Sequence, residues 1–150
     1  MATAEKSVDV NVPISTAYNQ WTQFEEFPHF MEGVEQVQQL DDQRTHWVTR
    51  VGGVRREFDA EIDIQEPDRR IAWSALTGPT QAGEVTFAPV DPLRTQITLT
   101  SDWDPQGVVE SAGDKLGLVE RRVQGDLERF REFIQARGTE TGAWRGSVND

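Results

Sequence analysis

The feature that most constrains the fold is a long apolar stripe near the end of the chain. Between residues 104 and 135, apolar side chains recur at steps of three and four, which places them on one face of an α-helix. The stripe consists of Val109, Ala112, Leu116, Val119, Val123, Leu127, Phe130 and Ile134. A helix of this length spans roughly 40 Å, enough to cross a small domain. The pattern therefore predicts a long helix whose apolar face covers the elements that precede it.

The preceding part of the chain reads as an antiparallel meander. Turn signals such as Gly52-Gly53 and Gly78-Pro79 interrupt it at short intervals, as expected for hairpin-connected strands. Strands are predicted at residues 34–40, 44–51, 54–65, 70–76, 82–88 and 94–102, with a first strand at 6–12. Between the first strand and the meander, helical spacing predicts a short helix from Ile14. The aromatic-rich segment 24–33, broken by Pro28, predicts a second short helix or turn at the rim of a cavity.

Alternation within the strands assigns the two faces of the sheet. Phe58, Ala60, Ile62 and Ile64 fall on one face, and Glu57, Asp59, Glu61 and Asp63 fall on the other. An antiparallel sheet with one solvated face must cover its apolar face, and the long helix supplies a matching surface. The order of elements predicts an α+β fold in residues 1–137. Residues 138–150 form a C-terminal extension in which Trp144 docks on the domain.

Composition bounds the classes of function. The 150 residues suit one domain, and the net charge of −11 disfavours binding to nucleic acid or to anionic membranes. No apolar run approaches the ~20 residues needed to cross a bilayer, so membrane insertion is not expected. The chain has no cysteine, which excludes disulfides and thiolate chemistry but does not fix the compartment. Its start lacks the basic and apolar segments typical of a secretory signal, so we expect a cytoplasmic protein. The oligomeric state stays open.

Several short motifs, in their order and spacing, resemble a known family. They are residues 17–24, 27–34, His46-Trp47, Gly52-Gly53 with 58–61, 70–73, 83–87, 126–130 and 142–146. Together they resemble the polyketide cyclase/dehydrase and lipid-transport branch of the START-like (SRPBCC) superfamily, over nearly the whole chain. The resemblance implies a helix-grip fold, in which a seven-stranded antiparallel sheet wraps around the C-terminal helix and leaves an elongated apolar cavity between them.

The resemblance and the alternation together predict which residues line that cavity. The inward positions of the strands are Trp47, Thr49, Phe58, Ala60, Trp73, Val85, Phe87, Ile97 and Leu99. The long helix contributes Leu116, Val119 and Val123, and one end is closed by Trp21, Phe27, Phe30 and Met31. An aromatic pattern cannot by itself distinguish a hollow interior from a filled one. A filled core stays open as an alternative.

Polar candidates for chemistry are few. His29 and His46 are the only side chains with an ordinary pKa near neutrality, and alternation turns His46 toward solvent. Glu120 falls within the apolar stripe and either aims its carboxylate at the cavity or reaches water from the stripe's edge, which is the favoured reading. Arg50, beside Gly52-Gly53, either meets an acidic head group or pairs with the acidic face of the sheet.

No metal site and no cofactor are predicted. The chain lacks a His-x-x-x-His pair, a phosphate-binding loop and a dinucleotide fingerprint. A solvated strand face explains the acidic residues better than paired catalytic carboxylates do.

Three functions follow as hypotheses. The first is non-enzymatic binding of a small hydrophobic molecule such as a lipid, a quinone or an aromatic polyketide. The alternative is a polyketide cyclase, dehydratase or aromatase acting in the same cavity, for which His29, Glu120 and Arg50 are the only weak catalytic candidates. The third is an interaction module with a filled interior. Gly113 and Gly117 weaken the first half of the long helix, so this half, broken near Gly113, is predicted to gate the cavity.

Overall fold

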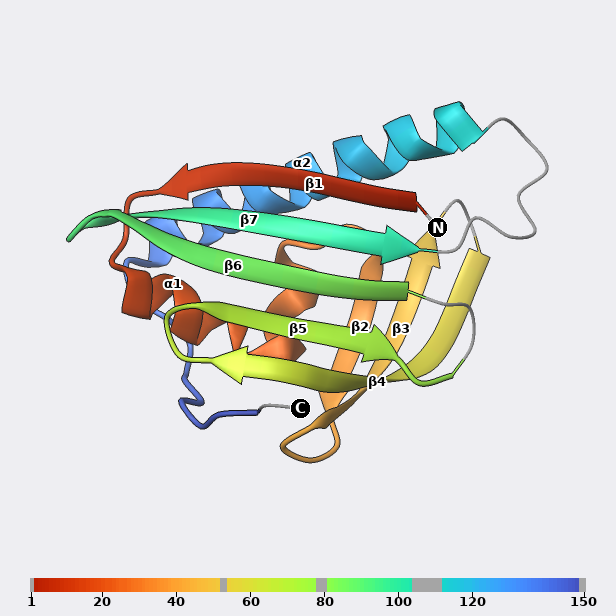
Figure 1. Ribbon diagram of the computed structural model, residues 1–150, viewed down its shortest axis with the longest axis horizontal. Coiled ribbons are helices and arrows are strands. Elements are labelled where there is room, and N and C mark those ends of the chain that lie inside the picture. Colours follow the sequence, from red (N-terminus) through yellow and green to blue (C-terminus); the bar gives the residue numbers. More distant parts are fainter. Residues whose placement is uncertain (1, 52–53, 78–80, 104–111, 149–150) are drawn as a thin grey trace.

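The protein is a curled seven-stranded antiparallel sheet with a long C-terminal helix, α2 (Figure 1). The structure, a computed structural model, describes residues 2–51, 54–77, 81–103 and 112–148. Its elements in chain order are β1 (Ala2–Val10), α1 (Ile14–Trp21), the 3-10 helix η1 (Phe24–His29), β2 (Val34–Gln39), β3 (Arg44–Val51), β4 (Val54–Glu66), β5 (Arg70–Ala75), β6 (Gln81–Asp91), β7 (Arg94–Trp103) and α2 (Ala112–Arg137).

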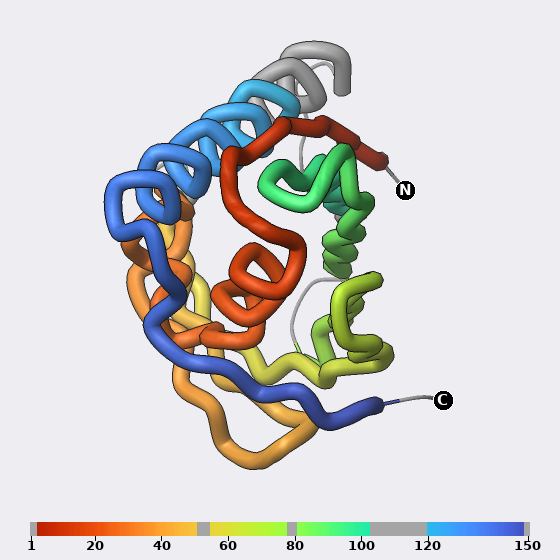
Figure 2. The backbone as a smooth tube through the Cα atoms, turned by 90° about the vertical axis from the view of Figure 1, so that its left-hand side faces the viewer, coloured from red at the N-terminus to blue at the C-terminus, as the bar shows by residue number. Residues whose placement is uncertain are grey.

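The strands are arranged in the order β1-β7-β6-β5-β4-β3-β2. Consecutive strands from β2 to β7 are neighbours, and β1 joins the far edge by pairing with β7, with Val8 opposite Ile97. Figure 2 shows the sheet curling around α1, with α2 alongside β1. The prediction of an α+β helix-grip fold is confirmed.

The apolar stripe of α2 is buried along its second half. Val123, Leu127, Phe130 and Ile134 are all buried in the core. The helix runs unbroken from Ala112 to Arg137, through Gly113 and Gly117. Residues 104–111, where we also expected helix, lie outside the described residues. The predicted gate at this end of the helix stays a prediction.

One face assignment was wrong. A β-bulge between Ile62 and Ile64 adds one residue to β4, so that Ile62 pairs with Trp73 but Ile64 pairs with Ala72. A single extra residue reverses the alternation beyond it. Ile64 is therefore on the outer face, while Gln65 points inward and is only 2% exposed.

The first strand begins earlier than predicted. β1 starts at Ala2 and ends at Val10, whereas we expected 6–12. Alanine has little intrinsic preference for strands, so the sequence pattern did not predict strand structure at the start of β1. Pairing with β7 stabilises these residues as a strand, since Ala4 pairs with Ser101 and is buried.

Candidate functional site

One end of the sheet's curl is closed by aromatic side chains from α1, η1 and α2. Phe24 and Phe27 of η1 and Phe30 directly after it are three residues apart, the repeat of a 3-10 helix, so that they share one side. The ring of Trp21 lies 5.3 Å from Phe27 and 5.2 Å from Phe130 of α2, centroid to centroid. All five rings are at most 1% exposed. This closed end is packed as tightly as an ordinary core.

The inner face of the sheet continues this aromatic surface. Trp47 stacks on Phe58 and on Trp73, with both pairs of centroids 5.9 Å apart. The indole nitrogen of Trp47 donates to the Thr45 hydroxyl at 2.7 Å. The ring of Trp73 covers Gly83 so closely that a Cβ at this position would lie 2.5 Å from the ring. The glycine therefore lets the ring lie flat against β6.

Inward residues farther along the sheet keep some accessible surface. Trp73 is 9% exposed and Phe87 7%, whereas Tyr18 and Phe27 at the closed end are 0% exposed. The same partial exposure, between 4% and 6%, is found for Met31, Trp47, Phe58, Leu99 and Val123. Ala60, Val85 and Ile97 are fully buried, and Thr49 is half-buried. The side chains of Leu116 and Val119 lie outside the described part of the structure.

Two buried polar atoms near the closed end have no hydrogen-bond partner in the described part of the chain: the Tyr18 hydroxyl and the Trp21 indole nitrogen. Burial raises the pKa of Tyr18 to about 12, and the Gln65 side chain offsets part of that rise without forming a hydrogen bond of standard geometry. The sequence predicted only that Tyr18 lies in the short helix. Its place on the apolar side of that helix, close to Trp21, was the signal that could have predicted a buried hydroxyl.

The three weak catalytic candidates lie in three different environments. His29 is exposed, stacks on Phe133 and lies 3.8 Å from Glu26. The Glu120 carboxylate reaches the ammonium of Lys6 on β1 at 3.2 Å, and both side chains are more than a third exposed. This contact agrees with the reading in which Glu120 leaves the edge of the stripe.

Arg50 donates to the Glu35 carboxylate at 2.8 Å on the outer face of the sheet. Of the two alternatives for Arg50, the structure agrees with pairing to the acidic face of the sheet rather than with binding of an acidic head group. Each of the three candidates is engaged with its own surface partner, and the structure does not bring them together.

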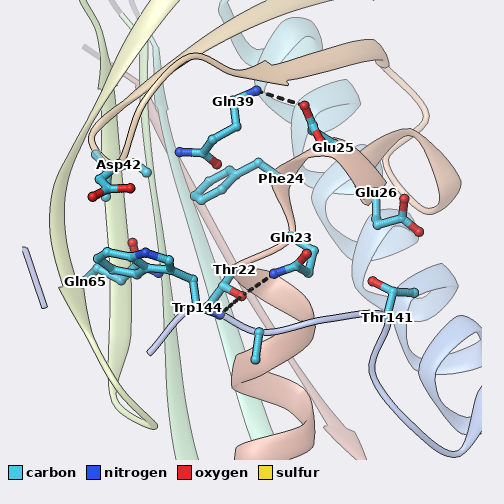
Figure 3. A pocket seen from close by; sticks show the side chains of 12 residues that line it. Thr22, Gln23, Phe24, Glu25, Glu26, Gln39, Asp42, Gln65, Thr141 and Trp144 are labelled. Atoms are coloured by element: carbon cyan, nitrogen blue, oxygen red, sulfur yellow. Dashed lines mark hydrogen bonds between the residues drawn. The ribbon is translucent and has the colours of Figure 1, made fainter. Parts of the chain in front are cut away.

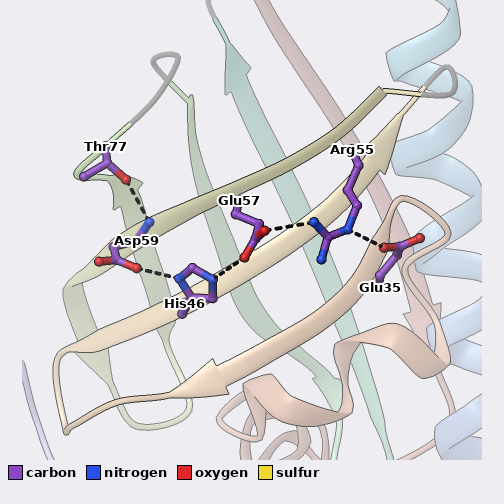
Figure 4. Close-up of polar contacts among 6 residues, drawn as sticks. All are labelled: Glu35, His46, Arg55, Glu57, Asp59 and Thr77. Atoms are coloured by element: carbon purple, nitrogen blue, oxygen red, sulfur yellow. Dashed lines mark hydrogen bonds and ion pairs between the residues drawn. The ribbon is translucent and has the colours of Figure 1, made fainter.

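His46 belongs to a polar network on the outer face (Figure 4). Its Nδ1 lies 2.7 Å from an Asp59 oxygen, and its Nε2 lies 3.2 Å from a Glu57 oxygen. Arg55 continues the network from Glu57 to Glu35. The hydrogen bonds from Asp59 and then Glu57 raise the pKa of His46. This placement agrees with the alternation, which turned His46 away from the interior.

The C-terminal segment crosses the closed end and is tied to it by polar contacts. The Gln20 carboxamide exchanges two hydrogen bonds with Thr141, and the Trp144 amide donates to the Thr22 hydroxyl at 3.0 Å. Arg145 lies over the Tyr18 ring, 5.4 Å from its centroid. Val148 then forms an antiparallel bridge with Gln65 at the end of β4. Trp144 is docked on the core, as predicted.

This segment forms one wall of a pocket of about 370 Å³ (Figure 3). The other walls come from η1, the β2–β3 turn and β4. The pocket is lined by Thr22, Gln23, Phe24, Glu25, Glu26, Gln39, Asp42, Ile62, Gln65, Thr141, Ala143 and Trp144. No sequence pattern predicted this pocket, because its walls are far apart in the chain and no local pattern joins them.

Within the described ranges, no group of three or more His, Cys, Asp or Glu side chains is arranged to hold a metal ion. In the same part of the chain, the helices are too short or too polar to cross a membrane.

Comparison with known proteins agrees with this geometry. Residues 10–131 match the model of the family described as polyketide cyclase / dehydrase and lipid transport. An uncharacterized 17.2 kDa protein of Streptomyces lincolnensis is 56% identical, over 99% of both chains.

Two solved structures share the fold. The Zhui aromatase/cyclase from Streptomyces sp. R1128 has 22% identity and a TM-score of 0.75, and the match covers 95% of this chain and 99% of that one. A START superfamily protein from Mycobacterium smegmatis has 14% identity and a TM-score of 0.68, with 90% and 95% of the two chains covered. With its family-model match over residues 10–131, the chain belongs to the polyketide cyclase / dehydrase and lipid transport family.

Proposed function

We propose that the protein binds a small hydrophobic molecule, such as a lipid, a quinone or an aromatic polyketide, between the inner face of the sheet and α2. The observation that carries this proposal is the partial exposure of inward side chains such as Trp73, Phe58 and Leu99, each from a different strand. These side chains face the interior yet keep some accessible surface, and we take that surface as the lining of a space between the sheet and α2.

The chemistry of this surface favours an apolar, flat ligand. The rings of Trp47, Phe58 and Trp73 present stacked aromatic faces, which suit ring systems and acyl chains. A ligand with a flat apolar body fits this surface, because it can stack on these rings.

Binding is favoured over catalysis because the polar candidates do not converge. A cyclase in this cavity needs positioned groups that exchange protons with the substrate. His29, Glu120 and Arg50 instead contact Glu26, Lys6 and Glu35. The aromatase/cyclase activity in the name of one structural relative belongs to that protein, at 22% identity. Cyclisation of a poly-β-ketone is therefore the competing outcome to be tested.

Leu99→Trp tests the cavity directly. If there is space beside Leu99, the larger ring fills it, the free energy of unfolding changes little, and Nile red displacement by a fatty acid, a benzoquinone or a hydroxyanthraquinone is lost. If the interior is filled, overpacking costs ~1–3 kcal/mol. Gln96→Trp, on the exposed outer face of the same strand, is the matched control and should leave both properties unchanged.

Native mass spectrometry of the full chain with the same three probes supplies the second readout. A 1:1 complex in the parent protein that disappears in Leu99→Trp supports the proposal. Absence of any complex, together with a destabilised Leu99→Trp variant, would overturn it. Conversion of a poly-β-ketone to a cyclised product would replace it with the cyclase alternative.

A further inference from the structure

The pocket beside the C-terminal segment has rigid apolar walls. Phe24 and Ile62 are 1% and 2% exposed, so their positions are fixed by the core. Trp144 is held from two sides, by its amide hydrogen bond to Thr22 and by the strand bridge of Val148. Figure 3 shows the rings of Phe24 and Trp144 on neighbouring walls of the same hollow. Because Trp144 is only half-buried, its ring keeps surface that a flat apolar group can cover.

The polar rim of the pocket offers mainly hydrogen-bond acceptors. The amide nitrogens of Gln23 and Gln39 donate to Thr22 and to the Asp41 carbonyl, so their carboxamide oxygens stay available. One Glu25 oxygen accepts from the Gln39 backbone amide, which leaves the other oxygen available. None of the ion pairs among the described residues includes Asp42.

The charge of the pocket has one sign. Glu25, Glu26 and Asp42 line it, and no lysine or arginine does. The ion pair of Glu26 with His29 is long, at 3.8 Å. A protein of net charge −11 adds a field that attracts cations toward this rim. Both the acceptors and the charge therefore select a ligand that carries positively charged donors.

A buried amide at the back of the pocket gives an independent indication of a ligand. Gln65 is 2% exposed and lines the pocket, although its position on β4 is inward. The Gln65 side chain lies close enough to the Tyr18 hydroxyl to lower its pKa, yet that hydroxyl has no hydrogen-bond partner among the described residues. A buried carboxamide with unused hydrogen-bonding capacity is unfavourable unless something else satisfies it.

From these features we propose that the pocket is a second binding site, separate from the cavity under α2, and that it takes a small arylalkyl amine. The aryl group lies against the half-buried Trp144, and the ammonium group faces Asp42 and Glu25. Because Trp144 forms a wall, occupation of the site also stabilises the docked C-terminal segment. The site does not depend on the function proposed for the cavity.

The test uses 2-phenylethylamine as the probe and 2-phenylethanol as its neutral analogue, titrated into the full chain and followed by NMR. We expect the amine to bind more tightly than the alcohol by about fivefold or more, as for a partly exposed charge pair. The strongest shifts should be at the Trp144 indole, and added salt should reduce the difference.

Asp42→Asn is the decisive variant, because Asp42 is exposed and its replacement leaves the fold intact. It should weaken amine binding about fivefold and leave alcohol binding unchanged. Glu128→Gln, an equal loss of charge at an exposed position of α2, is the matched control and should not change amine binding.

Trp144→Leu should weaken both probes, and melting curves with and without amine show whether the C-terminal segment remains docked. Equal affinity for amine and alcohol, unchanged binding in Asp42→Asn, or no detectable binding of the amine would each overturn the proposal. Leu99→Trp should leave the amine site intact, so that a failure of this inference can be told apart from a failure of the proposed cavity.

Discussion

The two faces of the sheet use the same strands in opposite ways. On the inner face, the buried ring of Trp47 packs against Phe27 of η1, with the two centroids 5.7 Å apart. On the outer face, His46, Glu57 and Arg55 form a network of exposed charged groups. Burial of one large apolar side chain contributes about 1.5–3 kcal/mol, whereas an exposed ion pair contributes about 0–1 kcal/mol. Stability should therefore depend mainly on the inner face, whereas the outer face chiefly determines the surface charge.

Phe27→Ala should give the largest effect, because Phe27 is fully buried and contacts rings from four elements. The lost transfer energy and the resulting cavity should lower the free energy of unfolding by about 3–5 kcal/mol, measured by urea denaturation. Arg55→Ala on the outer face is the control and should cost less than about 1 kcal/mol. Similar losses for both variants would refute the comparison.

The C-terminal segment should behave as part of the inner face. Ending the chain after Gly138 removes the buried Val148 and the docked Trp144, and it leaves Gln20 without the partner that satisfies its carboxamide. We expect a loss of about 2–4 kcal/mol and a lower melting temperature by circular dichroism. Arg145→Ala, which removes only partly exposed contacts, should cost far less. An unchanged melting temperature would show that residues after Gly138 are dispensable for stability.

Asp126 is a buried carboxylate on the inner side of the molecule. Burial stabilises an apolar side chain but disfavours the charged form of a carboxylate. Its Oδ1 accepts from the Glu32 amide at 3.1 Å and from Arg129. Burial raises its pKa, and these two hydrogen bonds offset only part of the rise. Asp126→Ala should cost about 1–3 kcal/mol, because both donors lose their acceptor. Asp126→Asn keeps an acceptor oxygen and should cost less.

The sign of the pH dependence follows from the raised pKa of Asp126. The folded protein binds this proton at higher pH than the unfolded chain does, so the contribution of Asp126 to stability rises as pH falls toward the ordinary value. Asp126→Asn should remove this component from a series of denaturation curves between neutral and acidic pH. If the variant and the parent protein keep the same dependence, the carboxylate is not desolvated.

Changes to the contacts of His46 should have the smallest effect on the free energy of unfolding but a clear effect on the pKa of its imidazole. Its pKa is raised by Asp59 and Glu57, so its contribution is fully present below pH ~6.5 and is lost as pH rises through the raised value. Asp59→Asn should shift the pKa of His46 down toward 6.5 in an NMR titration, with a change in stability below about 1 kcal/mol. Glu128→Gln is the charge-matched control. An unmoved pKa would contradict the assignment of the outer network.

Sequence patterns predicted the elements well because local periodicity encodes which face of each element is apolar. The stripe from Val123 to Ile134 and the inward positions Phe58 and Ala60 are buried as expected. The β-bulge before Ile64 was not predicted, because one added residue leaves no mark in the composition of the strand. The burial of Asp126 was not predicted either. The available signal was its position three residues after Val123 and four before Phe130, which places it within the apolar stripe.

The candidate sites were only partly accessible to sequence reasoning. Alternation and family resemblance predicted which strand residues face the interior, and those described are buried or half-buried; that they line a cavity under α2 stays a prediction. The second pocket depends on Trp144 meeting residues such as Phe24 and Asp42 more than a hundred positions earlier. No repeat or motif within one segment encodes such a meeting, and only the three-dimensional structure shows it.

The pairing of β1 with β7 also affects how the chain reaches its native state. Ala4 lies opposite Ser101, so the sheet cannot be completed by contacts between neighbours in sequence. Closing so long a loop costs entropy before any pairing energy is gained, and folds dominated by such contacts form slowly. During synthesis, β1 emerges first and must wait for β7. Until β7 is made, the edge of β6 and the apolar inner face of the sheet are exposed. Binding by a chaperone would matter most during this period.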